Sequence, residues 1–189
     1  MKTLNIKKIL KIIGVLVLAF IGYIAYMILN PVSPKETVKY NTSFSEIEVV
    51  YSRPYKKGRE IFGKEEEGAL VPFGKYWRTG ANAATTFESS KDILFNSQKL
   101  EAGKYRLYTV PAEKEWKVVL NSEGDKFFAI SEPDYSLDVL ETSIIAESDS
   151  SNVVEQFTIK FSNTEGSSEA IMSLMWDDVS VNIPIAPIN

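Results

Sequence analysis

The sequence predicts a single antiparallel β-sandwich, or a barrel-like domain, that follows one N-terminal transmembrane helix. Three observations support this fold class. An uncharged apolar run lies within the first 30 residues. Beyond it, apolar residues recur with a period of two rather than about 3.6, which is the periodicity of strands. Turn-forming stretches such as EAGK, PAEK, NSEGDK and SNTEGSS separate these runs, and such spacing is typical of all-β sandwiches and barrels.

Residues 1–30 are interpreted as a basic start and a membrane anchor. The apolar run IIGVLVLAFIGYIAYMIL follows four lysines: Lys2, Lys7, Lys8 and Lys11. At about 1.5 Å per residue this run gives roughly 27 Å, close to the roughly 30 Å of a hydrocarbon core. We therefore expect one span at about residues 9–29.

A cleaved signal peptide is the alternative interpretation of this segment. Its apolar core is usually about 7 to 15 residues long and ends at an A-x-A-like site, whereas YMILNPVSPK follows Ala25. The chain has no cysteine, which excludes a lipoprotein anchor. The excess of lysine on the short N-terminal side predicts that this end is cytoplasmic and that the chain after Asn30 is extracytoplasmic in the cytoplasmic membrane.

Residues 31–43 are expected to form a polar, extended linker, because two prolines break the helix and polar residues follow. One domain is then expected over residues 44–189. Four of the 21 basic residues precede the linker, so 17 remain against 25 acidic residues, a net charge of −8. This balance argues against nucleic acid as a partner, since nucleic acid requires basic patches.

Strands are expected wherever the period of two recurs. The runs are FSEIEVVY, DILFN, KYRLYTV, EWKVVLN, DVLETSII, EQFTIKF, AIMSLMW and VSVNIPI. In EQFTIKF we expect Phe157, Ile159 and Phe161 to point inward, while Thr158 and Lys160 face water. AIMSLMW is apolar on both faces and is therefore expected to be a central, covered strand.

Two further strands carry tryptophans that alternation places in the core, Trp116 and Trp176. In KYRLYTV the alternation separates two sets of residues, namely Tyr105, Leu107 and Thr109 from Arg106, Tyr108 and Val110. No long amphipathic helix, internal repeat or low-complexity tract is found in this domain.

The missing residue types constrain the chemistry most. Without histidine or cysteine, a Ser-His-Asp triad, a thiol nucleophile, a His or Cys zinc site and covalent haem attachment are excluded. Carboxylates, lysine, tyrosine, serine, threonine and arginine remain. Two acidic clusters stand out, Asp177-Asp178 and the run Glu65 to Glu67. Adjacent strand residues point to opposite faces and acidic runs are usually solvated, so we expect no metal site and no cofactor.

The stretch YWRTGANAATTFESSKD, residues 76–92, is expected to be a corner between strands. Gly80 permits a turn that a Cβ would obstruct, and Asn82 can adopt a left-handed conformation. Trp77 would anchor this corner in the core. Arg78 has two interpretations, a buried bridge to a carboxylate such as Glu88, which we favour, or an anion-binding head in a cleft.

Four residues are candidates for binding a ligand: Arg53, Arg59, Arg78 and Asn82. Arg53 and Arg59 flank an irregular segment that could face the same cleft as Arg78, although solvated loop arginines are the commoner case. We interpret this region first as a structural corner, second as a ligand-binding surface and third as an active site.

An ordered set of motifs covers nearly all of the predicted domain. These are SRPYKKGREIFG, LVPFGKYWRTGANAATTFESSKDI, EAGKYRLYTVPAEKEWKVVLN and LMWDDVSVNIPI. Together they strongly resemble the bacterial family called domain of unknown function 2911. The resemblance implies an exported or envelope-anchored protein and no established activity. The chain differs from the family pattern at Ala83, where an acidic residue is common, and after VVLNSEG, where a tryptophan-glycine pair is common.

The sequence thus favours a non-catalytic, membrane-anchored β-domain that binds an extracytoplasmic ligand or protein, with the lipid bilayer as partner of the helix. The alternative is an envelope hydrolase that uses carboxylates, tyrosine or lysine. A third possibility is a structural part of an envelope assembly. Paired carboxylates in a concave pocket would favour the hydrolase, and an exposed aromatic patch would favour binding.

Overall fold

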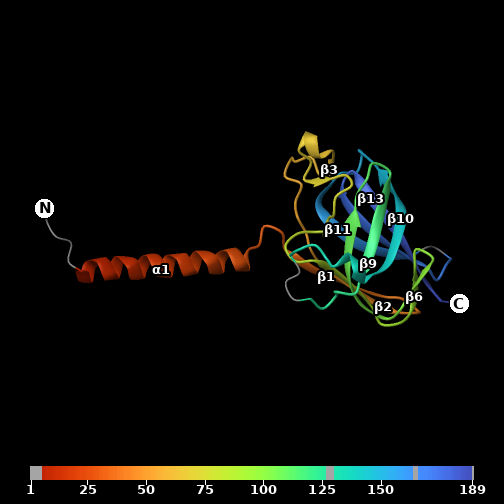
Figure 1. Ribbon diagram of the computed structural model, residues 1–189, viewed down its shortest axis with the longest axis horizontal. Coiled ribbons are helices and arrows are strands. Elements are labelled where there is room, and N and C mark those ends of the chain that lie inside the picture. Colours follow the sequence, from red (N-terminus) through yellow and green to blue (C-terminus); the bar gives the residue numbers. More distant parts are fainter. Residues whose placement is uncertain (1–5, 127–129, 164–165, 189) are drawn as a thin grey trace.

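The computed structural model describes residues 6–126, 130–163 and 166–188. Helix α1 (Ile6–Leu29) extends away from a β domain that contains the remaining described residues (Figure 1). Its segment Ile6–Met27 has a mean hydropathy of 2.3 and none of it is buried against the domain. By length and composition, α1 can cross a membrane once. The helix ends at Leu29. The amide and side chain of Asn30 both donate to the Tyr26 carbonyl, and Pro31 cannot continue the helix.

The β domain is built on an eleven-stranded sheet whose pairs are all antiparallel within the described part of the chain. Its main path runs in the order β1-β2-β5-β8-β9-β10-β13-β12-β11. Two strands lie off this path: β6 pairs with β13, and β7 pairs with β6. The strands of this path are β1 (Lys35–Asn41), β2 (Glu46–Ser52), β5 (Thr85–Ser89), β8 (Gly103–Val110), β9 (Glu115–Asn121), β10 (Asp138–Ser148), β11 (Val154–Asn163), β12 (Ala170–Asp177) and β13 (Val179–Pro187). The other elements are β3 (Phe62–Gly63), β4 (Val71–Pro72), β6 (Ile93–Phe95), β7 (Gln98–Leu100) and the 3₁₀ turns η1 (Glu65–Glu67) and η2 (Tyr135–Leu137).

The sheet curls until its two ends meet, so the domain is a nearly closed barrel. At the seam, Tyr40 of β1 stacks on Phe161 of β11 with ring centroids 4.9 Å apart, and its hydroxyl bonds the Asn163 side chain. Beyond β2, the Phe157 amide donates to the Pro54 carbonyl at 2.9 Å. The predicted antiparallel β class is therefore confirmed, and of the two arrangements the barrel-like one is observed.

Alternation predicted the core correctly at its largest side chains. Trp116, Phe157 and Trp176 are 1–2% exposed. Along β11, Phe157 and Ile159 are buried and Phe161 is half-buried, while Lys160 is exposed. Strand β12 lies between β11 and β13, as its two apolar faces predicted.

The expected start of the β domain needs correction, and one strand is covered on both faces. The expected linker at residues 31–43 contains β1, all seven residues of which pair with β2, so the sheet begins at Lys35 rather than near residue 44. In β8, Arg106 and Tyr108 are 0% and 3% exposed although they point away from the face that carries Leu107. Glu123, Ser131, Tyr135 and Asp138, all from the chain after β9, contact this second face, and a covered face buries both sets of an alternating strand.

Candidate functional site

The corner after Trp77 forms as its residue types predict. Asn82 is left-handed, with φ of 59°. A Cβ on Gly80 would meet the Ser52 carbonyl oxygen at 2.8 Å. Trp77 is buried and its indole N–H donates to the Gly80 carbonyl at 3.1 Å. The corner is therefore a tightly bonded structural turn that holds Trp77 in place.

Arg78 and Asn82 brace the start of the β domain. The Arg78 guanidinium donates to the Asn82 carbonyl, and the Asn82 side chain donates to the Ser33 carbonyl at 3.1 Å. The favoured bridge from Arg78 to Glu88 is wrong. Glu88 is exposed on β5 opposite Glu48 and Lys104, and the turn at Gly80 directs Arg78 back onto its own corner.

Arg53 lies at the seam. Its Nε is 2.9 Å from the Glu36 carboxylate and donates to the Phe157 carbonyl at 3.0 Å, and its Nη2 donates to Thr158 at 2.7 Å. The guanidinium thus ties β1 and β2 to β11. Arg59 lines the cavity described next and the other three candidate residues do not, so the four are not gathered in that cavity.

That cavity, here called the tryptophan pocket, has a volume of about 480 Å³. Its lining includes Trp77, Trp176, Val71, Tyr55, Lys57 and Arg59. The two indole rings stack at 5.8 Å between centroids, and Trp77 also contacts Phe157 at 5.0 Å. The pocket therefore has a rigid aromatic base and two cationic side chains. Its volume lies in the range of about 300–1,000 Å³ that is usual for small-molecule sites.

Segments far apart in the chain build this pocket. Val32 and Ser33 come from the stretch after α1, Pro54 to Arg59 from the turn after β2, and Leu70 and Ala81 from the loops before β5. Three apolar residues of the lining remain partly exposed, with Val32 at 68%, Leu70 at 43% and Tyr55 at 37%. An exposed apolar rim around an aromatic base suits an apolar ligand.

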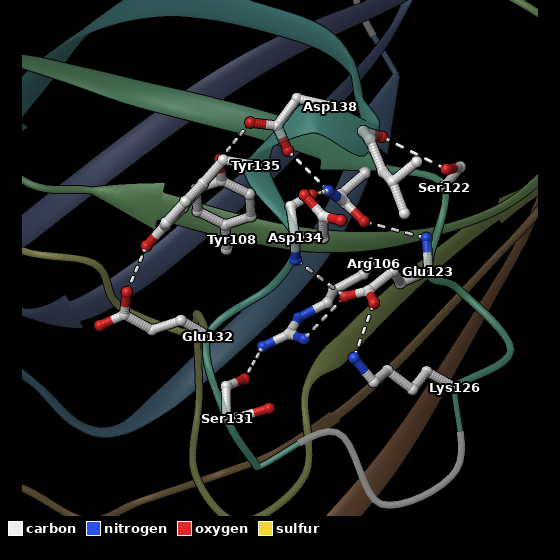
Figure 2. Close-up of polar contacts among 12 residues, drawn as sticks. Arg106, Tyr108, Ser122, Glu123, Lys126, Ser131, Glu132, Asp134, Tyr135 and Asp138 are labelled. Atoms are coloured by element: carbon white, nitrogen blue, oxygen red, sulfur yellow. Dashed lines mark hydrogen bonds and ion pairs between the residues drawn. The ribbon is translucent and has the colours of Figure 1, made fainter.

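A second cluster surrounds Arg106 on the outer face of β8 (Figure 2). Its guanidinium donates to the Tyr76 hydroxyl at 2.6 Å and to the Ser131 carbonyl, and it lies 3.5 Å from the Glu123 carboxylate. Lys126 bonds the other oxygen of Glu123 at 2.7 Å and, with the nearby charges, lowers the pKa of this carboxyl. Arg106 Nε has no hydrogen-bond partner among the described residues.

The polar contacts continue beside Arg106 to Tyr108. Its hydroxyl donates to Asp138 at 2.7 Å, and Asn121 donates to the other oxygen of Asp138 at 2.8 Å. Burial, followed by this bond to Asp138, raises the pKa of the Tyr108 hydroxyl. Burial also raises the pKa of Tyr135 to about 12. Both tyrosines are therefore neutral near neutral pH, and the bond from Tyr108 to Asp138 holds the start of β10 against β8.

Sequence reasoning missed the Arg106 cluster. A usable signal was present, because Tyr108 and Val110 make the second face of KYRLYTV apolar as well, and that pattern indicates a strand covered on both sides.

The acidic clusters have structural contacts. Asp177 pairs with Lys56 and Asp178 accepts from Ser148 at 2.7 Å, while the Glu65–Glu67 turn is exposed. A smaller hollow of about 240 Å³ on the outside of β2 and β5 has Glu46, Glu48 and Glu88 in its lining. Within the described ranges, no group of three or more acidic residues is arranged to hold a metal ion.

Comparison with known proteins identifies the domain. The family model described as Protein of unknown function (DUF2911) matches residues 33–185. The chain belongs to this family. The DUF2911 match confirms the resemblance found in the sequence motifs, and it spans β1 to β13 almost completely. It also includes Ser33 and the other pocket-lining residues after it, so the tryptophan pocket lies within the DUF2911 domain. No curated protein and no solved structure matched the chain.

Proposed function

We propose that this protein is a single-pass, membrane-anchored binding module of a bacterial cell envelope, and that its tryptophan pocket holds a small ligand with an apolar body. The observation that carries this proposal is the pocket itself, a cavity of about 480 Å³ based on the stacked Trp77 and Trp176. The two indoles are almost wholly buried and form a fixed base, so most of the apolar contact area comes from the exposed Val32, Tyr55 and Leu70 around them.

Binding fits the lining better than hydrolysis does. No aspartate or glutamate is among the residues that line the tryptophan pocket. A catalytic lysine or tyrosine is activated by an adjacent base or, for lysine, by burial in an apolar pocket that lowers its pKa. Lys57 Nζ lies 6.0 Å from the centre of the Tyr55 ring, and both side chains are exposed. Neither has the geometry of an activated nucleophile.

The anchor is supported by α1 and by charge. The helix has a mean hydropathy of 2.3 over Ile6–Met27, and lysines but no acidic residues flank its N-terminal side. Under the positive-inside tendency the N-terminus is cytoplasmic and the β domain is extracytoplasmic.

Pocket filling tests the proposal. The full chain is reconstituted in nanodiscs of zwitterionic lipid, and the neutral apolar dye N-phenyl-1-naphthylamine is titrated while energy transfer from tryptophan is recorded. Ala81→Phe places a ring inside the pocket and is expected to reduce transfer strongly. The matched control is Ala83→Phe, two residues away on an exposed position outside the lining.

The control is expected to behave like the parent. Equal transfer in the parent and both variants would overturn the proposal, because the dye would then be reporting only its partition into lipid. Unfolding curves of the two variants show whether either ring disturbs the fold.

A further inference from the structure

We infer that the ligand of the tryptophan pocket is an anionic lipid from the adjacent membrane leaflet, with an acyl chain on the tryptophans and its phosphate at Lys57 and Arg59. This inference rests on the proposed function, because it requires both the anchor and the pocket.

The first argument is charge. The turn after β2 carries four basic residues, Arg53, Lys56, Lys57 and Arg59. Two of them form ion pairs, Arg53 with Glu36 at 2.9 Å and Lys56 with Asp177. Within the described ranges Lys57 and Arg59 have no ion pair with a carboxylate. Both line the pocket and both are exposed.

The donors of these two side chains remain largely available. Arg59 uses Nε and Nη2 on the carbonyls of Lys56 and Tyr55, which leaves N–H groups from its five donors for a phosphate. The Glu155 carboxylate accepts from the Lys57 amide at 2.9 Å, and it has no ion pair with the Lys57 ammonium among the described residues. The turn therefore presents positive charge beside an apolar cavity.

The second argument is place. Val32 lines the pocket and is three residues beyond Leu29, where α1 ends. Three residues reach at most about 11 Å, so the pocket wall cannot be far from the headgroup region. Ser33 and Pro34 are held against the domain, since their carbonyls accept from Asn82 at 3.1 Å and from the Arg53 amide at 2.9 Å.

The third argument is the apolar rim. Val32, Tyr55 and Leu70 expose apolar side chains around the pocket. In water this exposure is unfavourable, whereas lipid chains and the membrane interface would cover it. An apolar base, an apolar rim and two cations close to a bilayer match the chemistry of an anionic lipid better than that of a free anion.

Brominated lipids test this inference directly, because bromine quenches tryptophan on contact and two of the three tryptophans line the pocket. The full chain is reconstituted in nanodiscs that contain increasing fractions of phosphatidylglycerol or phosphatidylcholine with brominated acyl chains. Phosphatidylglycerol is expected to quench at a much lower fraction. The double variant Lys57→Ala/Arg59→Ala should reduce the affinity ratio of phosphatidylglycerol to phosphatidylcholine by about 25-fold. Each basic residue near an anionic lipid contributes about fivefold.

The matched control is Lys99→Ala/Lys117→Ala, which removes the same charge from exposed positions on β7 and β9, outside the pocket lining. It is expected to keep the preference. Inorganic phosphate added at the same headgroup concentration should not restore emission, and restoration would overturn the lipid in favour of a free anion.

The two proposals fail in different ways. Equal quenching by both lipids would overturn the inference that the ligand is an anionic lipid. The proposal of a binding pocket would still hold if Ala81→Phe reduces energy transfer to the dye. Quenching by neither lipid, together with dye transfer insensitive to Ala81→Phe, would overturn both.

Discussion

Arg106 is a fully buried arginine whose guanidinium is bonded on several sides. It contacts Ser131 and Glu123 (Figure 2) and also the Tyr76 hydroxyl. Its side chain and that of Glu123 are 1% and 12% exposed. Removing one member of a buried ion pair is much more costly than losing a surface pair. The Arg106 guanidinium therefore stabilises the packing of Glu123 and Ser131 against β8.

Arg106→Ala is accordingly expected to lower the free energy of unfolding by about 3 to 5 kcal/mol. Arg59→Ala is the matched control, since Arg59 is exposed and should stay within about 0.5 kcal/mol of the parent. Denaturant unfolding of the full chain, followed by tryptophan emission, measures both. A similar midpoint for the two variants would show that the buried charge contributes little.

Arg78 leads to a second expectation at this scale. Because its guanidinium bonds the Asn82 carbonyl and Glu88 lies exposed on β5, the two side chains should be energetically independent. A double-mutant cycle with Arg78→Ala and Glu88→Ala is expected to be additive within about 0.5 kcal/mol. A coupling of 1 kcal/mol or more, on the scale of about 0.5–3 kcal/mol for residues in contact, would restore the bridge that the structure lacks.

At the scale of elements, side chains close the barrel seam more than a strand ladder does. Tyr51 of β2 links the two sides, since its hydroxyl accepts from the Ile159 amide at 2.8 Å and donates to Glu36 at 3.0 Å. Its ring also packs edge-on against Phe157 at 5.4 Å. Two residues after Tyr51, the Arg53 guanidinium donates to the Phe157 carbonyl and to the Thr158 hydroxyl of β11.

Tyr51→Phe is expected to cost about 1–3 kcal/mol near neutral pH, because the buried Ile159 amide loses its acceptor. Burial raises the pKa of the Tyr51 hydroxyl above its ordinary value of 10.0. Above a pH of about 10 the unfolded chain therefore releases this proton first, and the parent loses up to about 1.4 kcal/mol per pH unit that the variant does not lose. The difference between parent and variant should shrink as the pH rises. Urea unfolding at several pH values measures it, and a constant difference would contradict the expectation.

At the scale of the whole molecule, strand periodicity predicts most of the fold because a sheet with one buried face imposes a period of two on its sequence. Strand β1 escapes prediction because only Val38 and Tyr40 are apolar among its seven residues, and both are only half-buried at the seam. Arg106 escapes because it is the charged member of the second face of β8, and only its apolar neighbours Tyr108 and Val110 indicate that this face is covered.

The tryptophan pocket could not be predicted from any one motif. Its lining comes from segments separated by more than a hundred residues, from Val32 to Trp176, and only the fold brings them together. The charge of Arg59 indicated a binding role and Arg59 does line the pocket, whereas no motif singles out Tyr55 and Lys57, four and two residues before it. The corner motif suggested Arg78 and Asn82 as ligand-binding residues. Instead, Arg78 donates to the Asn82 carbonyl and Asn82 donates to the carbonyl of Ser33 in the pocket wall.

The orientation of the chain in its membrane is a property of the whole molecule, and its composition offers a direct assay. Because the chain has no cysteine, single cysteines can be introduced without background. Thr3→Cys marks the N-terminal side of α1 and Glu66→Cys marks the exposed turn η1. The lysine asymmetry predicts that a membrane-impermeant maleimide reaches position 66 in intact spheroplasts and reaches position 3 only after lysis.

The same two variants distinguish the remaining topologies. Both positions should be labelled in detergent, and the cysteine-free parent should not be labelled at all. Labelling of position 3 in intact spheroplasts with protection of position 66 would reverse the orientation. A mature chain that lacks residue 3 by mass, while position 66 is still labelled, would show that the segment is a cleaved signal peptide. The anchor, and with it the lipid-binding role of the adjacent pocket, would then be wrong, because nothing would hold Val32 within about 11 Å of a bilayer.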